Sequence, residues 1–249
     1  MVCASNPDEI AVWCMDLGSP SAAVIAEWRA CLDVAEQSHA DRFHFHEDRS
    51  TYIAAHWLIR TALSSVGGVP PSDWRFVIEK LGKPRIDPTH GRPELRFNLS
   101  HTRGFVACAV CTDSEIGIDV EALGPRLAGI DIAKQFFSPS EVAILRSAAK
   151  DQRANMFFRF WTLKEAFIKA TGEGLSRALD SFSFSLDPVS ISFHPPDTAE
   201  EAQWQFIEQQ LTPRHLLAVA VRRPAPYSVM LTVRRIRPFK IIHDNDVAW

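Results

Sequence analysis

The chain has 249 residues, of which 46% are hydrophobic and 23% are charged, an ordinary composition for a soluble globular protein. This length allows one large domain or two small ones. With 27 basic and 30 acidic residues the net charge is −3, so composition gives no electrostatic reason to expect a nucleic-acid or membrane partner.

Targeting and cysteine features point to the cytoplasm. The first ten residues, MVCASNPDEI, lack the charged and apolar regions of a signal peptide, and no apolar run approaches the ~20 residues of a membrane span. The five cysteines have no framework spacing, and Cys108 and Cys111 would point to opposite faces of a strand, which argues against a zinc or redox site. We expect a reduced cytoplasmic protein that is a monomer.

The chain aligns with itself, which indicates an internal duplication. The matching segments are 8–17 with 114–123, 73–76 with 180–183, and 105–110 with 216–221. Each half is predicted to contain a strand, a long helix and two further strands, which is a small α+β unit. We place the boundary so that residues 1–113 form the N-terminal half and residues 114–249 the C-terminal half.

Sequence patterns predict helices in the first part of the N-terminal half and strands in its second part. Residues 19–45 are predicted to be helical with mixed polarity, and residues 50–66 show a strong helical pattern that ends at Gly67-Gly68. Residues 74–79 and 95–99 are predicted strands on either side of a turn rich in glycine and proline.

The second half has a helix start at Ser138-Pro139-Ser140-Glu141. Residues 188–202 contain Pro195-Pro196 and are predicted to be a surface loop. The tail, residues 225–242, is strand-like at first and then basic, with Arg234, Arg235, Arg237 and Lys240.

The segment 157–175, FFRFWTLKEAFIKATGEGL, is predicted to be a buried helix because apolar side chains surround it almost completely. It nevertheless contains Lys164, Glu165 and Lys169, and buried charges are costly unless they are paired or bind a ligand. Gly172 and Gly174 would end the helix. Alternatively, this is an ordinary core helix in which Glu165 and Lys169 form an i,i+4 ion pair.

The segment 116–121 alternates as a strand does, with Asp119 and Glu121 on one face. Two carboxylates this close repel each other, and a hard cation such as Mg²⁺ would relieve the repulsion and accept phosphate oxygens as further ligands. The alternative is a solvated polar face at a strand end. Gly117 would allow a ligand to approach the backbone closely.

Several motifs in this order resemble the 4′-phosphopantetheinyl transferases, most closely the surfactin-synthetase-activating type. The motifs are Arg42-Phe43 with Tyr52 and Arg60, Gly82-Lys83-Pro84, Phe97-Asn98-Leu99-Ser100-His101, Gly117-Ile118-Asp119-Val120-Glu121, and Trp161 with Lys164-Glu165, Lys169, Gly172 and Gly174. The resemblance covers roughly residues 10–222.

The resemblance implies an α+β fold of two similar halves related by a pseudo-twofold axis, each with a small antiparallel sheet packed on helices, and coenzyme A between them. It implies transfer of 4′-phosphopantetheine from coenzyme A to a serine of an acyl or peptidyl carrier protein, with release of 3′,5′-ADP. Mg²⁺ is the implied cofactor.

The resemblance also implies roles for individual residues. Asp119, Glu121 and Glu165 would bind the metal. Glu165, Lys169 and Lys164 would be catalytic, with Glu165 as base, as metal ligand or as both. Residues implied to bind coenzyme A are Arg42, Arg49, Lys83, Pro84, Ser100, His101 and Lys169.

One departure is that His39 and His56 stand where the family commonly has arginine, so the basic clamp on the 3′-phosphate of coenzyme A is thinner here. Two other functions stay open from the residues. One is a non-catalytic regulator that binds coenzyme A or a carrier protein, and the other is a Mg²⁺-dependent phosphohydrolase that uses water as its nucleophile.

Overall fold

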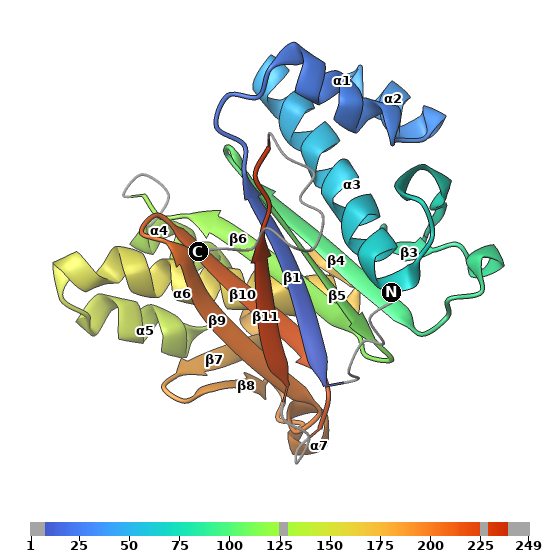
Figure 1. Ribbon diagram of the computed structural model, residues 1–249. Helices are drawn as coiled ribbons and strands as arrows, with labels where there is room; N and C mark the ends of the chain where they lie inside the picture. Colours follow the sequence, from blue (N-terminus) through green and yellow to red (C-terminus); the bar gives the residue numbers. More distant parts are fainter. Residues whose placement is uncertain (1–7, 125–128, 225–228, 239–249) are drawn as a thin grey trace.

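Two 22-residue helices, α3 (His46–Gly67) and α6 (Lys150–Thr171), organise the computed structural model, which describes residues 8–124, 129–224 and 229–238 (Figure 1). Each helix is followed by a glycine in the left-handed region, Gly68 at φ 71° and Gly172 at φ 73°. Glycine adopts this conformation without steric cost, so both predicted helix ends are confirmed.

The first half packs α3 against a sheet whose strand order is β11-β1-β5-β4. Its elements are β1 (Glu9–Asp16), α1 (Ala22–Ala30), α2 (Val34–Ala40), α3, η1 (Pro71–Asp73), β2 (Phe76–Ile78), β3 (Pro84–Ile86), η2 (Pro88–His90), β4 (Leu95–Thr102) and β5 (Phe105–Thr112). Strands β2 and β3 form a separate hairpin beside the sheet.

The second half packs α6 against a sheet with the order β6-β10-β9. Its elements are β6 (Ile116–Ala122), α4 (Ile130–Phe136), α5 (Pro139–Ser147), α6, η3 (Gly174–Ser176), η4 (Leu179–Ser181), β7 (Phe182–Leu186), β8 (Val189–Phe193), α7 (Thr198–Glu201), β9 (Trp204–Thr212), β10 (His215–Arg222) and β11 (Met230–Arg235).

The duplication is visible in the structure, since β1, α3, the β2–β3 hairpin, β4 and β5 recur as β6, α6, the β7–β8 hairpin, β9 and β10. This confirms the predicted α+β class. The prediction of a loop over residues 188–202 is wrong, because Ile191 and Phe193 alternate inward from β8 and join the core under α6.

The C-terminal segment does not stay with the second half. Strand β11 runs parallel to β1, with Glu9 opposite Met230 and Val12 opposite Val233, so the strand-like tail extends the first sheet. Residues 1–7, which we examined for a signal peptide, and Lys240 of the basic tail lie outside the described residues. No helix in the described part of the chain is long and apolar enough to cross a membrane.

The described residues form three apolar clusters. One lies between α3 and the first sheet and one between α6 and the second, and a third, which includes Val12, Ile118 and Leu217, lies between the two sheets. Burial of Ile116, Ile118 and Val120 in this third cluster turns the opposite face of β6 toward α6.

Gly117 lies on that opposite face. A Cβ atom at this position would lie 2.0 Å from the carbonyl oxygen of Ala166 and 2.4 Å from the amide nitrogen of Ala170. The close approach that this glycine permits is therefore that of the α6 backbone, and the expectation of a ligand at Gly117 is wrong.

Candidate active site

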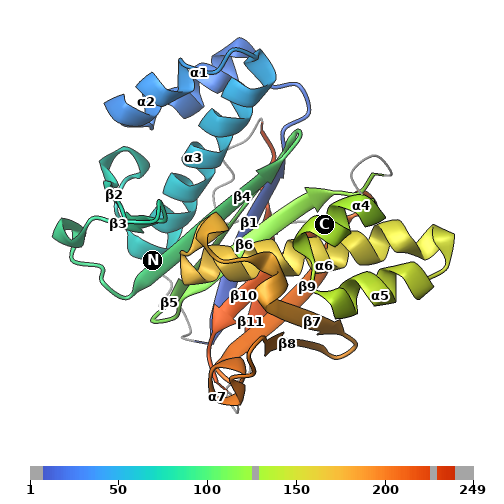
Figure 2. The ribbon, with the colours of Figure 1, turned by 180° about the vertical axis from the view of Figure 1, so that it is seen from behind.

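Strand β4 of the first half lies beside β6 of the second, a place that we call the seam (Figure 2). Three polar side chains from three elements meet there. The Lys169 ammonium of α6 lies 2.6 Å from Oδ1 of Asp119 on β6 and 2.9 Å from the Ser100 hydroxyl on β4. The Ser100 hydroxyl donates to the same Asp119 oxygen at 2.8 Å. The seam therefore joins a cation, a carboxylate and a hydroxyl.

Asp119 has an unused acceptor. The residue is 4% exposed, and its Oδ2 is buried without a hydrogen-bond partner in the structure. Buried polar atoms are nearly always paired, so an unpaired carboxylate oxygen here indicates a place for a ligand. Burial also excludes a solvated polar face for Asp119.

The negative charge of Asp119 affects the pKa values of two other carboxylates, Glu121 and Glu165. Burial and the charge of Asp119 raise the pKa of Glu121 to about 7, and the same two causes raise the pKa of Glu165. The Glu121 carboxylate accepts a hydrogen bond from the Trp161 indole at 3.1 Å. These three carboxylates form an electronegative cluster that a cation would stabilise.

The carboxylates do not form a closed metal site. Among the described residues, no three His, Cys, Asp or Glu side chains converge as a ready ligand set, and the Lys169 ammonium is bound to Oδ1 of Asp119. Oxygen donors on Asp119 and Glu121 fit Mg²⁺, which commonly binds one or two protein carboxylates and fills its other positions with phosphate oxygens and water. The donor set is therefore compatible with Mg²⁺ as a two-carboxylate site.

The catalytic role expected for Lys164 is wrong. This side chain is 0% exposed, and its ammonium lies 2.9 Å from Glu141 and 2.7 Å from each of the carbonyl oxygens of Leu179 and Phe182. An ammonium has three hydrogens, and all three have an acceptor inside the protein. Lys164 therefore cannot contact phosphate without unfolding its surroundings.

Lys83 is engaged in a similar way. The residue is 6% exposed, and its ammonium donates to the carbonyl oxygens of Ala170 at 2.6 Å and Ile116 at 3.2 Å, and to Glu115 at 3.0 Å. The expected phosphate contact is not available to an ammonium that already has three acceptors. Lys83 instead ties the hairpin of the first half to α6 and β6 of the second, and Pro84 beside it begins β3.

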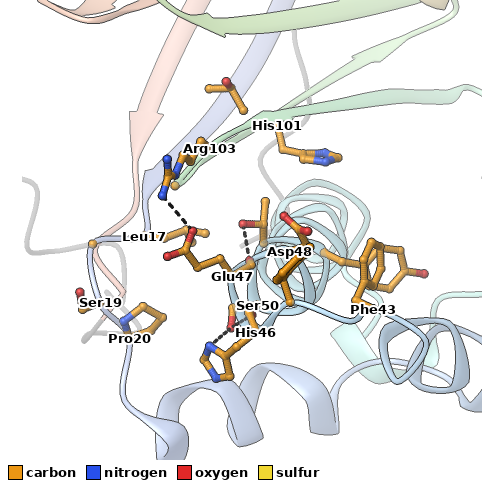
Figure 3. A pocket seen from close by; sticks show the side chains of 16 residues that line it. Leu17, Ser19, Pro20, Phe43, His46, Glu47, Asp48, Ser50, His101 and Arg103 are labelled. Atoms are coloured by element: carbon orange, nitrogen blue, oxygen red, sulfur yellow. Dashed lines mark hydrogen bonds and ion pairs between the residues drawn. The ribbon is translucent and has the colours of Figure 1, made fainter.

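His101 is exposed at the rim of a pocket of about 1080 Å³. In Figure 3 it projects from β4 on one side of this pocket, and Glu47 and Asp48 project from the start of α3 on the other. Desolvation and the nearby Lys169 ammonium lower the pKa of His101, so the ring favours its neutral form in the free protein. A bound anion would oppose this shift.

The expected basic clamp lies between α2 and α3. Arg42 is exposed and contacts His39 at 3.1 Å, whereas Arg49 donates to the Phe43 carbonyl at 3.4 Å and has a buried Nε without a partner among the described residues. His56 does not face solvent freely, because its Nδ1 lies 2.8 Å from Glu36. Of the two histidines, only His39 is exposed beside an arginine.

Two contributors were missed by the sequence analysis. Trp161, to which the sequence analysis gave no role beyond its place in a motif, donates a hydrogen bond to the Glu121 carboxylate. Asn98 accepts a hydrogen bond from the backbone of β6, although nothing in the pattern of β4 distinguishes it from an ordinary strand asparagine. The only sequence signal for Asn98 is its place in the Phe97–His101 motif.

Two family models match successive parts of the chain. One described as 4′-phosphopantetheinyl transferase superfamily matches residues 115–220, and one described as 4′-phosphopantetheinyl transferase, N-terminal, matches residues 18–113.

Similar proteins cover most of the chain. The 4′-phosphopantetheinyl transferase HetI of Nostoc sp. is 35% identical over 214 residues, which are 86% of this chain and 88% of the relative. The 4′-phosphopantetheinyl transferase Sfp of Bacillus subtilis is 36% identical over 185 residues, covering 74% and 79% of the two chains. A solved structure, the holo-[acyl-carrier-protein] synthase of Thermotoga maritima, aligns with 44% of this chain and 63% of its own at 21% identity and a TM-score of 0.37.

Proposed function

The chain belongs to the 4′-phosphopantetheinyl transferase superfamily, and from this premise we propose that its reaction takes place at the seam between β4 and β6. The protein is an enzyme that transfers 4′-phosphopantetheine from coenzyme A to carrier proteins, and the two alternative functions find no support among its relatives. The observation that best supports this location is the meeting of Ser100, Asp119 and Lys169 beside a buried, unpaired Asp119 oxygen.

We propose the following roles for the carboxylates. Asp119 and Glu121 hold Mg²⁺, with Glu165 as a third ligand or as the base. When bound, Mg²⁺ would neutralise charge on the pyrophosphate oxygens of coenzyme A. Glu165 suits a proton acceptor, because burial beside Asp119 raises its pKa and so strengthens it as a base.

We propose the following chemical step. The carrier serine hydroxyl attacks the β-phosphorus of coenzyme A, its proton passes to Glu165 directly or through water, and the bond to the bridging oxygen breaks. The leaving group is 3′,5′-ADP. The Lys169 ammonium, which contacts Asp119 in the structure, would move to a pyrophosphate oxygen and offset charge on the leaving group.

The remaining contacts to coenzyme A are proposed for His101, Arg42 and Arg49. His101 lies on the strand that carries Ser100, and its ring becomes a positively charged donor to phosphate when protonated. Arg42 and Arg49 provide permanent charge at the α2–α3 connection. Lys83 supports the site through α6, because its ammonium is already bound within the protein.

Acyl or peptidyl carrier proteins are the proposed acceptors, and the enzyme would act as a cytoplasmic monomer. Incubation of the protein with coenzyme A, Mg²⁺ and a panel of apo carriers tests the reaction by intact mass. A serine that gains the phosphopantetheinyl mass only when divalent metal is present is the expected result, whereas unmodified carriers in every case would contradict it.

The location at the seam is tested by Asp119→Asn. Turnover should fall by more than ~10²-fold, because a charge-neutralising contact in such a site contributes several kcal/mol to the transition state. Asp131→Asn is the matched control, since Asp131 is an exposed carboxylate on α4 whose side chain is 93% exposed. Near-normal turnover of Asp119→Asn would contradict the assignment.

A further inference from the structure

Strands β4 and β6 are neighbours, but they belong to different sheets and share no backbone ladder. The amide groups of Ile118 and Val120 on β6 are buried and point toward β4, so they need acceptors. Two side chains of β4 supply these acceptors. Oδ1 of Asn98 accepts from the Ile118 amide at 3.0 Å, and the Ser100 hydroxyl accepts from the Val120 amide at 3.3 Å.

These two hydrogen bonds bracket Asp119. Because Ile118 and Val120 are its immediate neighbours, the position of Asp119 along the seam is set by where Asn98 and Ser100 hold the strand. Ser100 also contacts Asp119 and Lys169 directly, so it belongs to the reacting site itself. Asn98 is 5% exposed and reaches the site only through the β6 backbone.

Asn98 is itself held firmly. Its strand is paired along the other edge with β5, where Asn98 lies opposite Ala109. The backbone of Asn98 is therefore fixed by the pairing of β4 with β5. Its side chain then fixes β6 of the second half relative to β4 of the first.

The duplication shows that this acceptor is not a requirement of the fold. Since residues 105–110 correspond to 216–221, Ala109 corresponds to Ala220, whose partner on β9 is Phe206. The equivalent of Asn98 in the second half is therefore a phenylalanine. The equivalent of Ser100 is Glu208, which binds Arg159 of α6.

The duplication predicts an equivalent of the seam between β9 and β1, and the structure differs there as well. Strand β11 lies beside β1 and reaches β9 through a hydrogen bond from Arg235 to the Leu211 carbonyl. At the seam, by contrast, side chains of β4 join it to the backbone of β6. Only this seam has the polar residues of the proposed site.

We propose that Asn98 is a positioning residue for the transferase, which holds β6 in register with β4 so that Asp119 meets Ser100. This inference rests on the proposed location of the reaction. It assigns to Asn98 no contact with coenzyme A, so its loss should act on turnover and on Mg²⁺ affinity.

Two variants that lack the acceptor, Asn98→Leu and Asn98→Ala, test the proposal against Asn98→Asp, which keeps an oxygen in the same place. In both acceptor-free variants we expect kcat to fall at least about tenfold, because small misplacements of reacting groups are costly. The KM for coenzyme A should stay within about twofold, and the Mg²⁺ concentration for half-maximal rate should rise. Asn98→Asp should retain more activity than either.

Calorimetric titration of Mg²⁺ into the coenzyme A complex gives a readout that does not depend on transfer, and weaker binding in Asn98→Leu is expected there too. Phe206→Leu, at the equivalent position of the second half, is the control for a general loss of stability. It should lower the melting temperature without changing Mg²⁺ binding.

The proposal is overturned if Asn98→Leu and Asn98→Ala match the wild type in kcat and Mg²⁺ binding, or if their losses equal those of Phe206→Leu at the same melting temperature. Failure of both to fold would also overturn it, since Asn98 would then be a folding requirement. An inactive wild-type protein that still binds Mg²⁺ in an Asn98-dependent way would refute the proposed function alone.

Discussion

Lys164 and Arg60 occupy equivalent positions in the two halves of the fold, eight residues before the glycines that follow α6 and α3. Arg60 lies 2.6 Å from Glu36, and Lys164 lies 2.9 Å from Glu141. Each glutamate is the third residue of a helix and closes a capping box at that helix's start.

The correspondence extends to backbone contacts. Arg60 donates to the carbonyl oxygens of Pro71 and Trp74, just before β2, and Lys164 donates to those of Leu179 and Phe182, at the start of β7. In each half one buried cation thus fixes a capped helix, the long helix and the entry to the hairpin. This shared arrangement explains Lys164 as a structural residue.

Replacing Lys164 by methionine should therefore cost stability more than catalysis. Removing one partner of a buried ion pair leaves the Glu141 charge without a counter-ion, which costs about 3–5 kcal/mol of unfolding free energy. Urea unfolding and the kcat of the folded fraction measure the two effects. The double variant Lys164→Met/Glu141→Gln should recover part of the loss, because it leaves no uncompensated charge. A variant with wild-type stability and a large fall in kcat would restore the catalytic interpretation.

The sequence predicted the position of Asp119 correctly but not the environment of Lys164. Strand alternation placed Asp119 and Glu121 on one face, and the structure confirms that face as the one beside α6. Lys164 lies on a helix that is apolar nearly all round, so its pattern cannot indicate which side the ammonium reaches. The answer depends on Glu141, which belongs to a different helix.

The contacts of Lys83 and Asn98 could not be predicted from the sequence for the same physical reason. The partners of Lys83 are Glu115 and two backbone carbonyl groups of the other half, and the partner of Asn98 is a backbone amide of β6. Every residue has backbone groups, so no residue type marks these contacts in the sequence. The hairpin strand β8 was missed because the two prolines that follow it suggested a loop.

Gly117→Ala should disrupt the docking of α6 on β6. The added methyl group would lie 2.0 Å from the Ala166 carbonyl oxygen, which belongs to helix backbone and cannot rotate away. The helix would have to shift, and overpacking of this kind costs about 1–3 kcal/mol or more. We expect a lower melting temperature together with loss of turnover, because Lys169 lies on the displaced helix.

Gly124→Ala is the control for this test, since an added Cβ atom there meets nothing within 4 Å. Equal melting temperatures for the two variants would show that α6 does not approach β6 as closely as the structure indicates.

The stability of the metal-free protein should depend on Glu121. Its pKa rises from the ordinary 4.5 to about 7 because of burial and the charge of Asp119. The folded protein then keeps a proton at Glu121 that the unfolded chain releases, so this contribution to stability is present below pH 4.5 and is lost as the pH rises to about 7. The shift corresponds to at most about 3 kcal/mol.

Thermal unfolding in EDTA between pH 5 and pH 8, compared between the wild type and Glu121→Gln, isolates this contribution. The comparison is needed because the pKa values of His101 and His215 are lowered, mainly by burial, and these histidines favour folding as the pH rises. We expect the wild type to lose several degrees relative to Glu121→Gln over this range. Parallel curves would exclude the raised pKa.

The last prediction concerns the pH dependence of coenzyme A binding through His39. This side chain is exposed, stacks on Tyr52 at a ring distance of 4.8 Å and contacts Arg42, so it can reach a phosphate at the α2–α3 connection. His56 was the other candidate, but it is paired with Glu36 and is less available. A histidine attracts phosphate strongly only while it is protonated, whereas arginine keeps its charge throughout this range.

The discriminating comparison is coenzyme A against dephospho-coenzyme A, which lacks only the 3′-phosphate, at pH 6 and pH 8.5. A charge-assisted hydrogen bond contributes about 1.5–3 kcal/mol, so the preference for the full coenzyme should shrink several-fold or more at the higher pH. In His39→Arg the preference should stay constant with pH. His194→Arg adds the same charge in the second half, directly after β8, and should leave the pH dependence unchanged. If the wild type shows one preference at both pH values, His39 does not contact the 3′-phosphate, and Arg42 and Arg49 would account for that affinity.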